Sequence, residues 1–275
     1  MISNDKKELS LFAIKVREGI VKSTAAAGSG HPGGSLSSAD YFTYLYNKVI
    51  RVNPENPADP ARDRFVLSKG HVAPGLYSTL ALKGFFPVDE LLTLRKIGSR
   101  LQGHPNMNLT PGVDMSTGSL GQGISAAVGM AIANKLDNNE HRIYAMLGDG
   151  ECQEGEVWEA SMAAAHYKLD NLCAILDFNG LQIDGDIRDV MSPLPFDEKF
   201  KAFGWHVIEI DGHNFDEIRN ALNEPKTVKG KPTMIIAHTV KGKGVSYMEN
   251  AANWHGVAPN AEQCEIALKD LEVIK

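Results

Sequence analysis

The sequence contains little cysteine and has no excess of positive charge. Three of its 275 residues are cysteine, widely spaced and without a CxxC pair, which argues against a disulfide framework and a zinc ribbon. The formal net charge is −6, whereas non-specific binding to nucleic acid or membrane surfaces needs clustered positive charge. The sequence also lacks a run of about 18 apolar residues, and its polar N-terminus has no signal-peptide core. We therefore expect a cytoplasmic protein that binds neither nucleic acid nor membranes.

The composition and the apolar pattern indicate an α/β protein. Hydrophobic residues make up 43% of the chain and charged residues 23%, as in ordinary globular proteins. Nearly continuous apolar runs alternate with helical patterns, which is typical of a parallel sheet covered on both faces. We predict one doubly wound α/β domain over residues 1–275, with a mostly parallel sheet and helices on both faces. The expected strands are 64–68, 142–147, 172–177, 205–210 and 233–239.

Helices are expected between and around these strands. The opening segment predicts a helix that ends near Gly28 and Gly30, followed by a glycine-rich turn, SGHPGGS. The small-residue helix at 121–134 is expected to pack within the core or against a partner. The other helices are predicted at 38–49, 74–82, 88–96, 154–167, 215–223 and 261–274.

Polar residues follow two of the expected strands at the point where each strand ends. Gly148-Asp149-Gly150 follows one apolar run, and Asn179 follows the next, 30 residues after Asp149. That spacing is about one βαβ unit, so the two strand ends can be adjacent. Carboxylate and amide oxygens suit Mg²⁺ or Ca²⁺, and Mg²⁺ commonly takes further ligands from phosphate. We therefore expect a divalent cation between Asp149, Asn179 and a diphosphate, the alternative being two ordinary turns.

Four of the nine histidines lie beside glycines: His31, His71, His104 and His255. Neutral imidazole both donates and accepts, so such a cluster can move protons near neutral pH. Each histidine taken alone is more often structural. The remaining five have no comparable context: His141, His166, His206, His213 and His238.

The segment LGDGECQEGEVWEASMAAAHYKLDNLCAILDFNGLQIDG resembles the thiamine diphosphate signature of transketolases. Further segments resemble the family in the same order along nearly the whole chain: SGHPGGSLS, DRFVLSKGHVAPGLY, GHP at 103–105, STGSLGQGIS and KGKGVSYMENAANWHG. The chain departs from many members at Ser119, Phe178 and Val257, none of which is an expected metal ligand. The resemblance implies the thiamine diphosphate-binding fold.

The resemblance implies roles for individual residues. Asp149, Asn179 and the backbone carbonyl of Leu181 would bind Mg²⁺ or Ca²⁺. His31, His104 and His255 would be catalytic through contacts with the donor ketose and the reacting carbon. Glu154 would join a carboxylate network between subunits, or would simply favour a helix N-terminus. The implied contacts to thiamine diphosphate are Lys69, His71, Gly118, Ser119, Leu120, Gly148, Asp149, Gly150, Glu151, Asn179, Lys241 and His255.

The family also implies a partner. In full-length transketolases a second, pyrimidine-binding domain supplies the Glu that activates the cofactor, and we find no such domain in this sequence. We therefore expect the N-terminal subunit of a split transketolase, active on sugar phosphates only with a separate C-terminal subunit, as two copies of each chain. The alternatives are a transketolase for an unusual sulfo- or branched sugar, a decarboxylating thiamine enzyme subunit, and a non-catalytic cofactor-binding protein.

Overall fold

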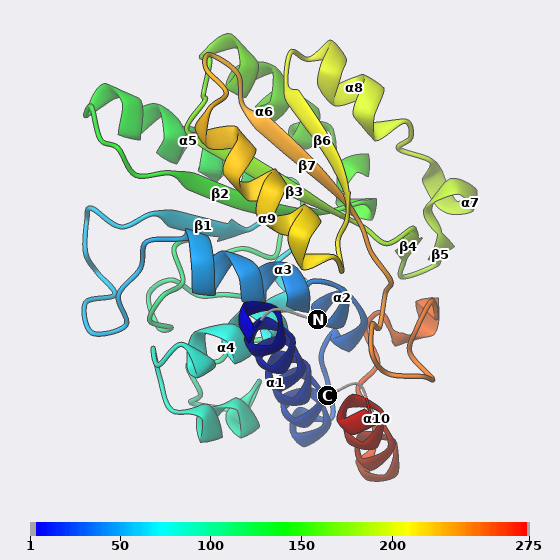
Figure 1. The fold of residues 1–275 in the computed structure, drawn as a ribbon. Helices are drawn as coiled ribbons and strands as arrows, with labels where there is room; N and C mark the ends of the chain where they lie inside the picture. The colour runs from blue at the N-terminus through cyan, green and yellow to red at the C-terminus, as the bar shows by residue number, and fades with distance from the viewer. Residues whose placement is uncertain (1–3, 274–275) are drawn as a thin grey trace.

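The computed structural model describes residues 4–273, and a parallel sheet of five strands forms its centre (Figure 1). All neighbouring strands in this sheet run parallel, which confirms the predicted α/β fold class. In spatial order the strands are β1 (Arg64–Leu67), β2 (Ile143–Gly148), β3 (Leu172–Phe178), β7 (Thr233–His238) and β6 (His206–Asp211).

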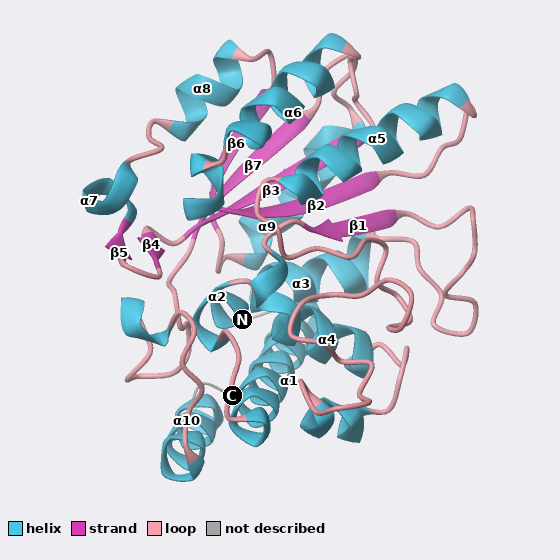
Figure 2. Cartoon of the chain, turned by 180° about the vertical axis from the view of Figure 1, so that it is seen from behind, coloured by secondary structure: helices cyan, strands magenta, loops and turns pink. Residues whose placement is uncertain are grey.

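Helices cover both faces of the sheet, and Figure 1 and Figure 2 show the two layers from opposite sides. One layer contains α5 (Gln122–Leu136), α6 (Gly155–His166) and α8 (Phe196–Ala202). The other contains α1 (Asn4–Ala27), α2 (Pro32–Ser37), α3 (Ala39–Tyr44), α4 (Ala73–Leu82) and α9 (Phe215–Asn223). The last helix, α10 (Ala261–Val273), packs against α1.

Alternate side chains of each strand enter two separate apolar cores. On β2, Tyr144 and Met146 join the core that contains α4 and α9, whereas Ala145 and Leu147 join the core beneath α5 and α6. Successive side chains of a strand point to opposite faces, so a strand covered on both sides must be apolar throughout. This is why the strands appear in the sequence as unbroken apolar runs.

The prediction of a glycine-rich turn before residue 38 was wrong, because residues 32–37 form helix α2. Pro32 stands in its first turn, where its fixed φ suits a helix and no N–H is needed. Gly33 is required by packing, since a Cβ there would lie 2.8 Å from the carbonyl oxygen of Trp254. Glycine normally disfavours a helix, but here it lets the backbone of α2 approach the backbone at Trp254 closely.

Several other short segments also differ from expectation. The predicted helix at 88–96 is a 3₁₀ helix, η3 (Val88–Thr93), which ends where Leu94 is extended and Arg95 takes a φ of 59°. The hairpin of β4 (Leu181–Gln182) and β5 (Gly185–Asp186), helix α7 (Ile187–Met191) and helix α8 were not predicted. Strands of two residues are too short to show a period of alternation.

The remaining short elements lie in connections. They are the π-helical η1 (Leu45–Val49), which ends the predicted 38–49 helix, and the 3₁₀ segments η2 (Gly70–Val72), η4 (Gly150–Gln153), η5 (Glu224–Lys226) and η6 (Ala252–Trp254). Over residues 4–273, no helix has both the length and the apolar character needed to cross a bilayer.

Two glycines of α5 test how tightly this helix packs on β1. A Cβ at Gly123 would lie 2.5 Å from Cα of Ser68, whereas a Cβ at Gly129 would meet no atom within 4 Å. We expect Gly123→Ala to destabilise the chain by about 1–3 kcal/mol through overpacking. Gly129→Ala should stabilise it by up to about 1 kcal/mol, because alanine is the better helix former. Urea unfolding of both variants measures the difference, and equal midpoints would contradict the close packing.

Candidate active site

A cavity of about 310 Å³ opens at the carboxyl ends of the strands. Ligands of open parallel sheets bind at this end, so its position agrees with the expectation from the fold. Every residue of the predicted site lines the cavity except Ser119, which is exposed. The lining residues that the sequence did not single out are Gly34, Gln153, Gln182 and Ile183.

The two strand ends that carry Asp149 and Asn179 are adjacent, as predicted. Gly148 pairs with Asp177 across β2 and β3. Asp149 then accepts hydrogen bonds through Oδ2 from the Gly180 N–H at 2.6 Å and through Oδ1 from the Gly150 N–H at 2.8 Å. Asp149 caps η4, so the turn that follows β2 holds its carboxylate at the cavity.

The environment of Asp149 suits a cation. The carboxylate is 3% exposed. Burial, followed by the charge of Asp177, raises its pKa to about 6 although the two backbone N–H groups lower it. The hairpin after Gly180 brings the Leu181 carbonyl to the same cavity. These oxygen donors fit a Mg²⁺ ion that takes its other ligands from phosphate.

No cluster of acidic or histidine ligands competes with this set. In the described part of the chain, no group of three or more His, Cys, Asp or Glu side chains could hold a metal ion. A cation at Asp149 would therefore depend on amide, carbonyl and diphosphate oxygens. That donor chemistry favours a hard ion over zinc.

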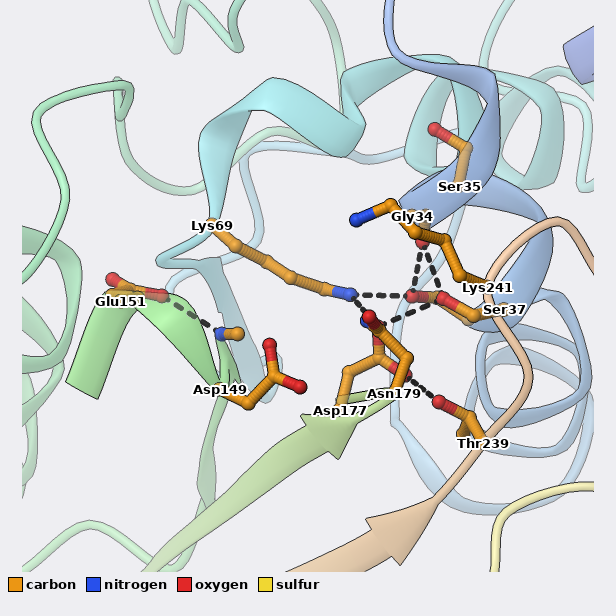
Figure 3. Close-up of polar contacts among 12 residues, drawn as sticks. Gly34, Ser35, Ser37, Lys69, Asp149, Glu151, Asp177, Asn179, Thr239 and Lys241 are labelled. Carbon is orange, nitrogen blue, oxygen red and sulfur yellow. Dashed lines mark hydrogen bonds and ion pairs between the residues drawn. The ribbon is translucent and has the colours of Figure 1, made fainter. Parts of the chain in front are cut away.

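Two buried lysines approach the site from opposite directions. Lys241 Nζ lies 2.9 Å from the Leu181 carbonyl oxygen and 2.8 Å from His255 Nδ1, and burial lowers its pKa to about 8. Lys69 Nζ instead lies 2.5 Å from Asp177 Oδ2 (Figure 3). It also donates to Ser38 Oγ at 2.8 Å. Both lysines line the cavity, but within residues 4–273 only Lys69 of the two forms an ion pair with a buried carboxylate.

Glu151 connects three segments around the cavity. Its Oε1 accepts from the Ser68 hydroxyl at 2.5 Å and the Gly121 N–H at 2.9 Å, and its Oε2 accepts from the Gly148 N–H at 3.0 Å. Burial raises its pKa. These contacts indicate a side chain that fixes the loops, and the contact with the cofactor that the resemblance implies stays a prediction.

The four histidines with glycine neighbours come together. The ring of His31 lies 5.3 Å from His71, 6.2 Å from His104 and 5.5 Å from His255 between centroids, and His71 stacks on His255 at 5.0 Å. None of the other five histidines lines this cavity within residues 4–273. The glycine contexts therefore separated the clustered histidines from the rest.

The neighbouring glycines permit this clustering. A Cβ at Gly118, where φ is 146°, would lie 3.0 Å from the His104 ring, and a Cβ at Gly70 would lie 2.7 Å from the Gly118 nitrogen. Larger residues at these positions would separate the loops that carry His71 and His104.

Burial keeps the cluster uncharged. Burial and then Arg95 lower the pKa of His31 to about 4, and burial and then Lys241 lower that of His255 to about 3. The pKa values of His71 and His104 are also lowered, first by burial. His31 Nδ1 is buried and has no hydrogen-bond partner within the described structure. In this part of the chain, Tyr41, Thr43, Arg62, Thr117, Asn134 and Asn171 also have a buried polar atom without a partner, so this feature does not by itself mark a ligand contact.

Comparison with known proteins identifies the family. The family profile "Transketolase, thiamine diphosphate binding domain" matches residues 11–272. This chain belongs to that family. It is 45% identical to the 6-deoxy-6-sulfo-D-fructose transketolase subunit of Clostridium sp. (strain MSTE9), over 98% of both chains. It is 44% identical to a subunit of the apulose-4-phosphate transketolase of Phocaeicola vulgatus, over 96% of this chain and 93% of that protein.

Solved transketolases share the fold of this domain. The Campylobacter jejuni enzyme matches with a TM-score of 0.89 and 35% identity, over 99% of this chain and 43% of that one. A Pichia stipitis transketolase matches with a TM-score of 0.91 and 33% identity, over 96% and 40%. This transketolase domain thus spans less than half the length of these solved chains.

Two features of this transketolase domain bear on the sequence predictions. Glu154 lies exposed at the rim of the cavity, at the N-cap of α6, and its side chain makes no capping bond. Asp177 was missed, although it follows five apolar residues of a buried strand and precedes Asn179 by two positions. A carboxylate in such a run must have partners, and that signal was available.

The neutral state of the histidines gives a prediction about pH. We expect the ring-proton resonances of His31 and His255 to remain unchanged between about pH 8 and about pH 5. The unfolded chain protonates these rings near pH 6.5, so the free energy of unfolding should decrease as the pH falls from about 6.5 towards 4.

Nuclear magnetic resonance, with assignments from His31→Gln and His255→Gln, measures the titration. The double variant should lose less stability over the same acid range than the wild type does. Titration of either ring between about pH 6 and pH 7 would contradict a buried, neutral cluster.

Proposed function

We propose that this chain is the cofactor-binding subunit of a two-subunit transketolase. It would transfer a two-carbon ketol unit from an anionic ketose to an aldose phosphate. The observation that carries the proposal is that one cavity collects both strand-end oxygen donors and all four clustered histidines. Metal and diphosphate donors alone would support only binding, whereas the histidines add proton-transfer groups beside them.

Asp149, Asn179 and the Leu181 carbonyl would hold Mg²⁺, or Ca²⁺ in its place, against the diphosphate of thiamine diphosphate. His71, Lys241 and the glycines at 118, 148 and 150 would surround the cofactor, with Leu120 beside its pyrimidine ring. When bound, thiamine diphosphate supplies an electron sink for cleavage of a carbon–carbon bond. Lys241 would exchange its bond to the Leu181 carbonyl for one to a diphosphate oxygen, which is the stronger acceptor for an ammonium.

The histidines of the chain would handle the sugar. A neutral imidazole can donate to a carbonyl oxygen and accept from a hydroxyl, so His31 and His104 can hold the donor ketose and move its protons. His255, fixed by its contact with Lys241, would lie at the reacting end.

The relatives favour an unusual sugar as substrate. The two relatives described above match this chain over nearly their whole length and are named for 6-deoxy-6-sulfo-D-fructose and for apulose 4-phosphate. Both names describe sugars with an anionic substituent. We therefore propose a sulfonated or branched ketose ahead of the common ketose phosphates, and place the decarboxylating alternative last.

A separate chain would complete the site. The same two relatives are named as transketolase subunits. We propose that a partner carrying the pyrimidine-binding domain supplies the activating Glu and most acceptor-phosphate contacts, in an assembly of two copies of each chain. Glu154, exposed at the rim of the cavity, would meet this partner.

Reconstitution tests the function. The chain is mixed with the pyrimidine-domain protein from the same source and supplied with thiamine diphosphate and Mg²⁺. Donors are 6-deoxy-6-sulfofructose, apulose 4-phosphate and fructose 6-phosphate, with an aldose phosphate as acceptor. We expect ketol transfer only from the complete mixture. Full activity of this chain alone, or release of CO₂ from pyruvate in place of transfer, would contradict the proposal.

Substitution of the strand-end carboxylate tests the metal site. Asp149→Asn removes the charge opposite the cation, so Mg²⁺-dependent binding of thiamine diphosphate should weaken at least about 100-fold, since outer partners of metal ligands alone are worth about 10–100-fold. Asp184→Asn makes the same charge change on an exposed residue of the nearby hairpin and should change binding less than about threefold. Titration calorimetry measures both, and equal behaviour of the two variants would count against the site.

A further inference from the structure

Asp177 is the most heavily hydrogen-bonded side chain beside the proposed metal site. It lies in β3 and is 2% exposed. Its Oδ2 accepts from Lys69 Nζ at 2.5 Å, from the Ser37 hydroxyl at 2.8 Å and from Asn179 Nδ2 at 3.0 Å. Its Oδ1 accepts from the Thr239 hydroxyl (Figure 3). Residues from three other segments, together with the neighbouring Asn179, thus converge on one carboxylate.

These contacts use most of the acceptor capacity of Asp177. An ionised carboxylate offers about four acceptor sites; three donors crowd Oδ2, one occupies Oδ1, and the Lys69 ammonium already compensates the charge. Asp149, by contrast, accepts only backbone N–H bonds in the described structure, one on each oxygen. Of these two buried carboxylates, Asp149 is free to face a cation and Asp177 is a support behind it.

The bond from Asn179 to Asp177 determines which way the Asn179 amide faces. With Nδ2 held by the carboxylate, Asn179 Oδ1 accepts from the Leu181 N–H at 3.1 Å. The reversed amide would place an oxygen against the carboxylate and an N–H against the Leu181 N–H. The reversed state therefore loses two hydrogen bonds and creates two repulsive contacts.

Lys69 keeps Asp177 in place. The ammonium is 1% exposed and divides its bonds between Asp177 and Ser38. A buried carboxylate without a counter-charge is strongly unfavourable, so the lysine offsets the desolvation of Asp177. Lys69 thereby acts on the site through Asp177, which differs from the cofactor contact that the sequence suggested.

We propose that Asp177, held by Lys69, is a positioning residue that presets Asn179 Oδ1 for the divalent cation by accepting the Asn179 amide N–H. The identity of the cation site rests on the proposed function. The orientation of the amide is a property of this chain alone. The two parts can therefore be tested separately.

Two double variants isolate the hydrogen bond from the ion pair. The leucine double variant combines Lys69→Met with Asp177→Leu, and the asparagine double variant combines Lys69→Met with Asp177→Asn. Both remove the buried charges, and replacing such a pair by residues of similar volume is often neutral for stability. Only the asparagine double variant retains a carbonyl oxygen that can accept from Asn179, with the new amide nitrogen turned to the Thr239 hydroxyl. Any difference between the two therefore reports on the acceptor.

Two measurements apply to the full chain. The first is hydrogen exchange of the Asn179 side-chain amide without ligands, with the resonance assigned from Asn179→Asp. The second is the Mg²⁺ concentration that half-saturates thiamine diphosphate binding, measured by calorimetry. Ser37→Ala, which removes one donor to Asp177 without touching Asn179, is the control.

We expect the leucine double variant to exchange the amide at least about tenfold faster than the asparagine double variant, and to need at least about tenfold more Mg²⁺. Ser37→Ala should change either value less than about threefold. Thermal unfolding confirms that each variant folds, and Lys69→Met with Asp177→Ala replaces the leucine double variant if it does not. Equal values for the two double variants in both measurements would overturn the positioning role. If the wild-type chain binds no cofactor even with the pyrimidine-domain protein present, the proposed function is contradicted, and amide exchange alone decides the positioning.

Discussion

Two buried carboxylates at the ends of adjacent strands constrain the rest of this site. Asp177 is balanced inside the protein by the Lys69 ammonium, whereas Asp149 is held by backbone N–H groups. Burial, and then the charge of Asp177, raises the pKa of Asp149. The fold brings them together because β2 and β3 are neighbours and both end here. A divalent cation at Asp149 would compensate the negative charge of this carboxylate, as the Lys69 ammonium compensates that of Asp177.

The same burial determines the state of the histidines. Imidazolium is disfavoured in a poorly solvated cavity that also contains Lys241, so the four rings remain neutral. Neutral rings can donate at one nitrogen and accept at the other, which a charged ring cannot do. The arrangement therefore combines an anionic side that attracts a cation and a neutral side that can exchange protons with a sugar. The described chain provides both sides from separate loops, and Glu151 connects the loops that carry Ser68, Gly121 and Gly148.

The sequence predicted the sheet, the two strand ends of the cavity and its four histidines from strong local signals, whereas most of the other lining residues came from the resemblance to transketolases. Unbroken apolar runs identified the strands. A strand end followed by Gly-Asp-Gly or by Asn can also be recognised from the sequence alone. The hairpin at 181–186 and helix α2 were missed because their conformations depend on packing, as at Gly33, whose close approach to Trp254 no local pattern reveals. The roles of Lys69 and Glu151 could not be predicted either, since each depends on a partner far away in the sequence, Asp177 and Ser68.

One half of this cavity is held by hydrogen bonds, and the other half has exposed residues. The half that contains the proposed metal site is fixed before any ligand arrives, because Asp149, Asn179 and Glu151 are each held by hydrogen bonds from neighbouring segments. The opposite half includes the exposed residues Ser119, Glu154 and Ile183 at or beside the rim. A preorganised half lowers the cost of binding a highly charged diphosphate, since its ligands need no reordering. An exposed rim beside it leaves a surface that a partner can cover without disturbing the metal site. This division follows from the fold, because the strand ends anchor one side of the cavity and loops form the other.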